Sequence, residues 1–131
     1  MDSGRALPVS KILVIDDSLL ERRVLRRYLE EGGFEVEDWL PLSALEVADH
    51  VTASAPALVL SDFQMPGVNG LTVAKMVQKA APATPVVILS SFLDPDVEEK
   101  LRKFGTKRCI HKPISGPNLV RILKELLDGG A

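Results

Sequence analysis

The sequence predicts an α/β protein in which a parallel β-sheet is covered by helices on both faces. Short apolar runs alternate with longer amphipathic segments along the 131 residues, which is typical of repeated strand–helix units. Most of the apolar runs are rich in β-branched residues and lack polar interruption, as expected of strands buried on both faces. The predicted strands are residues 11–15, 34–38, 57–61, 85–89 and 108–111.

The boundaries of the predicted helices carry recognisable capping residues. Gly32-Gly33 ends the first helix, and Asp94-Pro95 places a capping side chain before a proline that suits the first helical position. Residues 43–46 fit a capping box, in which a serine and a glutamate satisfy each other's backbone N–H groups. The predicted helices are residues 18–31, a short helix from 43, 70–78, 95–104 and 117–128.

Composition favours one soluble domain. Hydrophobic residues make up 46% of the chain and charged residues 26%, and the formal net charge is −2. The single cysteine, Cys109, excludes an intrachain disulfide, and no apolar run approaches the roughly 20 residues of a membrane span. Residues 1–10 do not resemble a secretion signal. We expect a cytoplasmic domain over residues 11–128, with tails at 1–10 and 129–131 and no binding to membranes or nucleic acid.

Polar residues follow four of the predicted strands at the point where each strand ends. They are Asp16 and Asp17, Ser61 and Asp62, Ser90 and Ser91, and finally His111, Lys112 and Pro113. Doubly wound sheets bind their ligands outside the carboxyl ends of the strands. The sequence therefore predicts that three carboxylates, several hydroxyls and one ammonium group lie together at one edge of the sheet.

This set of groups is suited to magnesium-assisted phosphoryl transfer. Neighbouring carboxylates repel one another unless a cation lies between them, and hard oxygen ligands favour Mg²⁺. A carboxylate such as Asp62 accepts a phosphoryl group when a metal ion and a lysine offset the incoming charge. Each feature alone has an ordinary structural explanation, as a helix cap, a turn residue or a polar loop. Their coincidence at the ends of four strands favours a single site.

Four features occur in this order along the sequence: Asp16-Asp17, Asp62 with the following Met65-Pro66-Gly67-Val68-Asn69-Gly70, Ser90-Ser91 and Lys112-Pro113. Together they resemble the receiver domain of two-component response regulators. The resemblance covers residues 11–128, and the intervals of 45, 28 and 22 residues between Asp17, Asp62, Ser90 and Lys112 agree with the family. It implies a flavodoxin-like (βα)5 fold with strand order 2-1-3-4-5.

The resemblance also implies a role for each matching residue. Asp62 is the expected phosphoacceptor, Ser90 the hydroxyl that turns toward the phosphoryl group, and Lys112 its cationic partner, followed by a cis peptide bond to Pro113. The expected ligands of Mg²⁺ are Asp16, Asp17, Asp62 and the backbone carbonyl of Gln64.

The implied function is a phosphorylation-dependent switch rather than an enzyme acting on a separate substrate. The donor is expected to be a histidine kinase or a histidine phosphotransfer protein. A downstream protein partner would read the change at the C-terminal helices, and the chain would be a monomer or a weak dimer.

Two other classes of protein share parts of this pattern. A small Mg²⁺-dependent phosphatase with an aspartyl-phosphate intermediate in general has a second acid two residues after the nucleophile, where this chain has Gln64. A flavin or nucleotide binder on the same topology would need a glycine-rich loop where this chain has Asp16-Asp17. The phosphatase is the leading alternative.

Several residues leave more than one interpretation open. Cys109 stands where the family usually has an aromatic switch residue, and it is either a small buried residue or a redox-sensitive thiol. Phe92 is a further departure, close to the phosphoryl site. His111 is expected to have a packing or surface role. The arginines of the first helix form either a solvated face or a docking surface for an acidic partner, and the wide apolar stripe of the last helix either completes the core or contacts a partner. These arginines are Arg22, Arg23, Arg26 and Arg27.

Overall fold

The computed structural model describes residues 9–128. Most of the predicted N-terminal tail and all of the C-terminal tail lie outside this range. Five strands alternate with five helices, as predicted. The strands are β1 Lys11–Ile15, β2 Glu35–Trp39, β3 Leu58–Asp62, β4 Val86–Ser90 and β5 Thr106–His111. The helices are α1 Leu19–Glu31, α2 Leu45–Ser54, α3 Gly70–Ala80, α4 Pro95–Lys103 and α5 Gly116–Asp128. Among the described residues, no helix is long and apolar enough to cross a bilayer.

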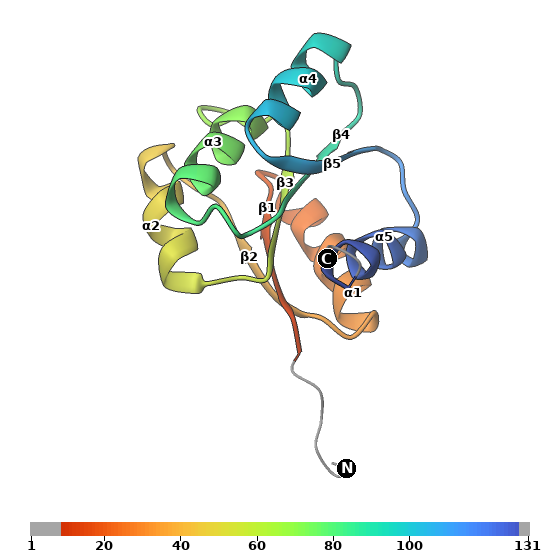
Figure 1. Ribbon diagram of the computed structural model, residues 1–131. Helices are drawn as coiled ribbons and strands as arrows, with labels where there is room; N and C mark the ends of the chain where they lie inside the picture. The colour runs from red at the N-terminus through yellow and green to blue at the C-terminus, as the bar shows by residue number, and fades with distance from the viewer. Residues whose placement is uncertain (1–8, 129–131) are drawn as a thin grey trace.

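The strands form one parallel sheet in the order β2-β1-β3-β4-β5, which confirms the predicted topology. Helices α1 and α5 cover one face, and α2, α3 and α4 lie on the other side (Figure 1). β1 and β3 are neighbours, with Ile15 opposite Ser61 in the register. Asp16 directly follows Ile15 and Asp62 directly follows Ser61, so both aspartates lie at the same edge of the sheet.

The core consists of two apolar layers, one on each face of the sheet. Alternate residues of β1 divide between them, because successive side chains of a strand point to opposite faces. Ile12 and Val14 pack toward α1 and α5, whereas Leu13 and Ile15 pack toward α2 and α3. All four side chains are fully buried. This two-sided burial accounts for the uninterrupted apolar runs in the sequence.

Capping side chains begin three of the helices. Ser18 and Asn69 each accept a hydrogen bond from a backbone N–H three residues later, and Asp94 accepts one from Asp96 N. The predicted capping box at residues 43–46 is only half formed. Glu46 accepts from the backbone N–H of Ser43, but the N–H of Glu46 itself donates to the backbone carbonyl of Ser43.

β5 begins at Thr106, two residues earlier than predicted. The register passes from Val86 opposite Thr106 to Val87 opposite Arg108, so Lys107 is an extra residue in the edge strand. A bulge of this kind interrupts the regular alternation that sequence patterns detect. The exposed cationic side chains of Lys107 and Arg108 also make this segment unlike a buried strand in sequence.

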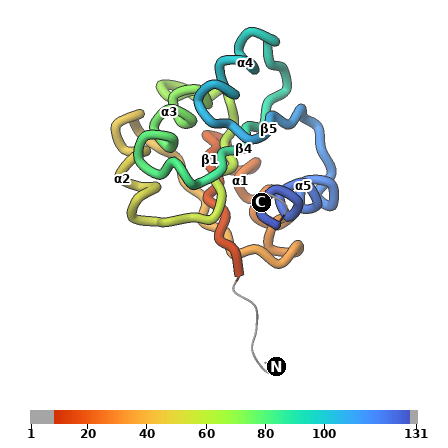
Figure 2. Tube along the Cα trace, in the orientation of Figure 1, coloured from red at the N-terminus to blue at the C-terminus, as the bar shows by residue number. Residues whose placement is uncertain are grey.

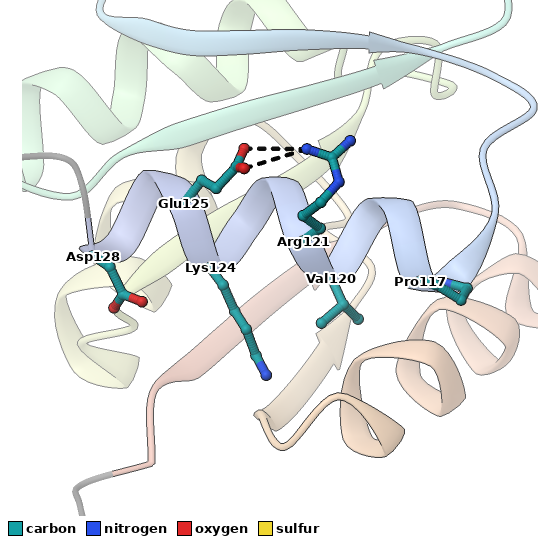
Figure 3. A pocket seen from close by; sticks show the side chains of 6 residues that line it. All are labelled: Pro117, Val120, Arg121, Lys124, Glu125 and Asp128. Atoms are coloured by element: carbon teal, nitrogen blue, oxygen red, sulfur yellow. Dashed lines mark hydrogen bonds and ion pairs between the residues drawn. The ribbon is translucent and has the colours of Figure 1, made fainter.

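α5 packs alongside α1, as Figure 2 shows from the Cα trace. Leu119, Ile122 and Leu123 are buried in the core, and Val120 also packs against that layer. The outer face carries polar groups, including an ion pair between Arg121 and Glu125 at 3.3 Å (Figure 3). Core packing therefore accounts for most of the apolar stripe of this helix.

Candidate functional site

Three carboxylates meet at the carboxyl ends of β1 and β3. Asp16, Asp17 and Asp62 each have an oxygen atom within 4.8 Å of the others, as the sequence predicts. Asp16 is fully buried, the Asp62 side chain retains 11% exposure, and Asp17 is exposed. The cluster thus extends from the interior to the surface, with one side open to solvent.

The Asp16 carboxylate is incompletely satisfied by the protein. Its Oδ1 accepts a hydrogen bond from Ser18 N at 2.8 Å, whereas its buried Oδ2 has no hydrogen-bond partner. A buried oxygen without a partner is costly unless a cation or water supplies the missing contact. With the oxygens of Asp17 and Asp62 close by, this donor set fits a hard divalent cation such as Mg²⁺.

Burial raises the pKa of Asp16 to about 7, and the nearby charges of Asp62 and Glu21 act in the same direction. The hydrogen bond from Ser18 opposes this change. Burial also raises the pKa of Asp62 above its usual value, although the bond from Lys112 partly offsets the effect. The cluster by itself therefore resists full ionisation, and a bound cation would favour the ionised carboxylates.

Lys112 connects the cluster to the end of β5. Its Nζ lies 3.1 Å from Asp62 Oδ1 and 2.9 Å from Glu21 Oε2. Burial lowers the pKa of Lys112, but these two contacts outweigh it, so the pKa is raised. Lys112 consequently remains charged near the carboxylate that is expected to react. The peptide bond to Pro113 is cis, as the resemblance implies.

Ser90 lies at the end of β4, in the strand next to Asp62. Its hydroxyl donates to Phe92 O at 2.7 Å and accepts from Phe92 N at 3.2 Å. The Ser90 hydroxyl therefore stabilises the start of the β4–α4 connection. Phe92 is 72% exposed, so the ring lies on the surface of the β4–α4 connection. Turning Ser90 toward the site would break both bonds to Phe92.

Gln64 lies in the loop between β3 and α3, two residues beyond Asp62, and its side chain is exposed. The loop is fixed at its base by a hydrogen bond from Gly70 N to Phe63 O at 2.7 Å. A Cβ added at Gly70 would lie 3.0 Å from the backbone Cα of Phe63, so this close approach favours glycine. The role of the Gln64 backbone carbonyl as a metal ligand remains a prediction.

Other residues singled out in the sequence have ordinary surroundings. Cys109 is partly buried against the apolar layer beneath α4, and burial raises the pKa of its thiol, which disfavours the reactive thiolate. His111 is 59% exposed and lies 3.6 Å from Glu98, in agreement with a surface role.

The arginines of α1 are largely engaged within the chain. Arg22 and Arg26 both contact Asp38 at the end of β2, and Arg22 also donates to the backbone carbonyl of Asp16. Arg27 pairs with Glu31. These contacts support a structural role for three of the four arginines that the sequence offered as a docking surface. Replacing Arg22 would disturb the carboxylate cluster as well as the helix surface.

Sequence reasoning missed Glu21. It lies in the first turn of α1, four residues after Asp17, and its carboxylate reaches Lys112. Helical spacing alone could have placed it near the edge of the sheet where the site lies. The contact with Lys112, which is 91 residues away, could not be predicted without the fold.

Comparison with known proteins agrees with this geometry. The family model for the response regulator receiver domain matches residues 12–124. The chain belongs to the response regulator receiver family. It is a domain of phosphorylation-dependent signalling, and members of this family act as switches rather than as conventional enzymes. The receiver is 30% identical over 118 residues to the polar-differentiation response regulator DivK of Brucella ovis and of Brucella abortus, covering 88% of this chain and 94% of each relative.

Solved structures show the same fold. A CheY-like receiver domain from Methanospirillum hungatei superposes with a TM-score of 0.84 at 23% identity, covering 93% of this chain and 96% of that one. The chemotaxis protein CheY4 of Vibrio cholerae gives 0.80 at 23% identity, with coverage of 90% and 98%. Receiver domains typically bind Mg²⁺ at an acidic cluster, and Asp16, Asp17 and Asp62 form such a cluster here.

Replacing Asp16 with asparagine is expected to stabilise the metal-free protein above pH 7 by about 2 kcal/mol, because the buried charge is removed. The raised pKa means that unfolded Asp16 releases its proton near pH 3.8 and folded Asp16 only near pH 7. Wild-type stability should therefore fall as the pH rises through this interval. Urea unfolding in EDTA at pH 5 and pH 8 measures the effect.

The same variant should lose at least tenfold in Mg²⁺ affinity, because one of the expected anionic ligands is removed. Asp49→Asn, at an exposed position on α2, is the matched control. Identical pH slopes in the wild type and Asp16→Asn would contradict the account of the buried carboxylate.

Proposed function

We propose that the chain accepts a phosphoryl group on Asp62, with Mg²⁺ held by Asp16, Asp17, Asp62 and the carbonyl of Gln64. The main support is one juxtaposition: the three carboxylates lie within 4.8 Å of one another, and Lys112 Nζ lies 3.1 Å from Asp62 Oδ1. This arrangement combines a nucleophile, a set of oxygen ligands and a fixed positive charge. Bound Mg²⁺ would neutralise charge on the transferring group and orient it.

The proposed step is an exchange of one bond to phosphorus. A carboxylate oxygen of Asp62 attacks the phosphorus, and the bond from phosphorus to the donor's imidazole nitrogen breaks, with its electrons leaving on that nitrogen. The donor is thus a phosphohistidine, carried by a histidine kinase or a histidine phosphotransfer protein. Lys112 offsets the charge of the phosphoryl oxygens throughout. Hydrolysis by water later restores the Asp62 carboxylate and releases phosphate.

Ser90 is proposed to transmit the reaction outward. Ser90 ends β4, the strand beside β3, and a rotation of its hydroxyl toward phosphorylated Asp62 would release Phe92. Phosphorylation adds roughly −1.5 to −2 charge, which is enough to bias a loop between two arrangements. We propose that a downstream protein partner recognises the altered surface at the β4–α4 connection and the last helices.

The proposal is tested by incubating the protein with Mg²⁺ and acetyl phosphate and measuring its intact mass. We expect a single phosphoryl addition that is stable in acid, labile in base and absent when EDTA replaces Mg²⁺. Steady release of phosphate from simple phosphomonoesters, without a modified protein, would support the phosphatase alternative. No addition under any condition would rule out phosphoryl acceptance.

A further inference from the structure

Lys112 is shared between two carboxylates. Its Nζ lies 2.9 Å from Glu21 Oε2 and 3.1 Å from Asp62 Oδ1, so the same ammonium group joins α1, β3 and the end of β5. Among the described residues, no cation other than Lys112 lies within ion-pair distance of Glu21.

The two carboxylates differ in their access to solvent. The Glu21 side chain is 46% exposed, the Lys112 side chain 20% and the Asp62 side chain 11%. Glu21 therefore lies on the outer side of Lys112, and Asp62 on the inner side. Glu21 and Lys112 both line a groove between α1 and the β5–α5 connection, together with Leu20 and Pro113. A phosphoryl group that bonds Lys112 must share it with Glu21 or displace it.

We propose that Glu21 restrains phosphoryl acceptance by competing with the incoming group for Lys112. This inference rests on the proposed function of Asp62. Before reaction, Glu21 satisfies part of the charge of Lys112 and adds a negative charge close to the route of an anionic donor. During reaction, the phosphoryl oxygens take over the contact, and Glu21 turns to water. The residue thereby disfavours strongly anionic small donors.

Glu21 could instead serve only to fasten α1 to the β5–α5 connection. An ion pair with a partner as exposed as Glu21 contributes little to stability. Such a structural role predicts that removing Glu21 leaves the reaction unchanged or slows it. Competition predicts a faster reaction, and the gain should depend on the charge of the donor and on salt. The two roles therefore differ in the sign of the effect.

The test compares Glu21→Gln with the wild type in single-turnover phosphorylation by acetyl phosphate, followed by intact mass. We expect the second-order rate constant to rise roughly fivefold at low ionic strength, since one like charge near the site is removed. The rise should be smaller with phosphoramidate, which carries less negative charge at neutral pH, and smaller at 1 M salt. Glu21→Asp, which keeps the charge but is too short to hold Lys112, should fall between.

Glu31→Gln is the matched control, because it also removes a glutamate of α1 that pairs with a basic residue, at a position away from the site. It should react at the wild-type rate. A Glu21→Gln protein that reacts no faster than wild type, or equally faster with both donors, would overturn the competition. Failure of the wild type itself to become phosphorylated would refute the proposed function instead, so the two failures are distinguishable.

Discussion

Asp62→Asn is expected to lose phosphoryl incorporation entirely, with a rate at least about 10³-fold below that of the wild type. The amide of asparagine keeps the shape of the side chain but has no anionic oxygen to attack phosphorus. Of the three clustered aspartates, Asp62 is the one whose carboxylate contacts Lys112, so neither Asp16 nor Asp17 has the same charge compensation. Intact mass after incubation with Mg²⁺ and acetyl phosphate measures the loss.

The variant should remain folded. Burial raises the pKa of Asp62, which means that the fold holds the charged form at a cost. Removing the charge should therefore leave stability in EDTA unchanged or slightly higher, as judged by urea unfolding. Asp49→Asn is the control for a loss of one carboxylate elsewhere, and it should be phosphorylated normally. Incorporation by Asp62→Asn at the wild-type level would show that another residue is modified.

Lys112→Ala is expected to slow phosphoryl acceptance by about 10²-fold, because a preorganised positive charge is lost from a partly buried site. The proposed nucleophile and metal ligands remain, so the reaction should be slowed rather than abolished. The variant also leaves Glu21 and Asp62 without their shared cation. Rates of single-turnover phosphorylation at saturating Mg²⁺ measure the effect.

Lys124→Ala is the matched control, since Lys124 lies on the outer face of α5 (Figure 3). Lys112→Arg should recover only part of the rate, because a planar guanidinium differs in shape from the ammonium group that meets Asp62. A Lys112→Ala protein that reacts within twofold of wild type would remove Lys112 from the proposed reaction.

The fold was predictable because its determinants are local and repeated. Each buried strand is an uninterrupted apolar run, and a capping residue such as Asp94 marks a helix start through a hydrogen bond to nearby backbone. The edge strand β5 was the least regular, because a bulge at Lys107 breaks its alternation. In the predicted capping box, the Glu46 side chain accepts from Ser43 N, but the Ser43 side chain does not cap the helix.

The site was predictable to the extent that strand ends define it. Asp16, Asp17, Asp62 and Lys112 all follow strands, and a doubly wound sheet brings such residues together. Contacts made across the fold were not predictable. Glu21 reaches Lys112 from a helix, and Arg22 is held by Asp38 rather than being free on the surface. The bond from Ser90 to Phe92 depends on a loop conformation that no pattern encodes.

Cys109 shows where the family pattern and this chain differ. The position lies on β5 opposite Ile88, and its side chain packs with the apolar layer that also contains Val97 and Phe104. A cysteine has no ring that could move between buried and exposed positions. Phe92 is the aromatic residue bonded to the site hydroxyl: its backbone carbonyl and N–H both contact Ser90, and its ring is exposed.

Chemical trapping of the modified residue tests the central claim most directly. After incubation with Mg²⁺ and acetyl phosphate, borohydride reduces an aspartyl phosphate to homoserine, and peptide mass spectrometry locates the product. The account predicts homoserine at position 62 in the wild type and none when Mg²⁺ is withheld. Homoserine at another aspartate, or a phosphoryl group retained on a serine such as Ser61 or Ser90, would contradict it.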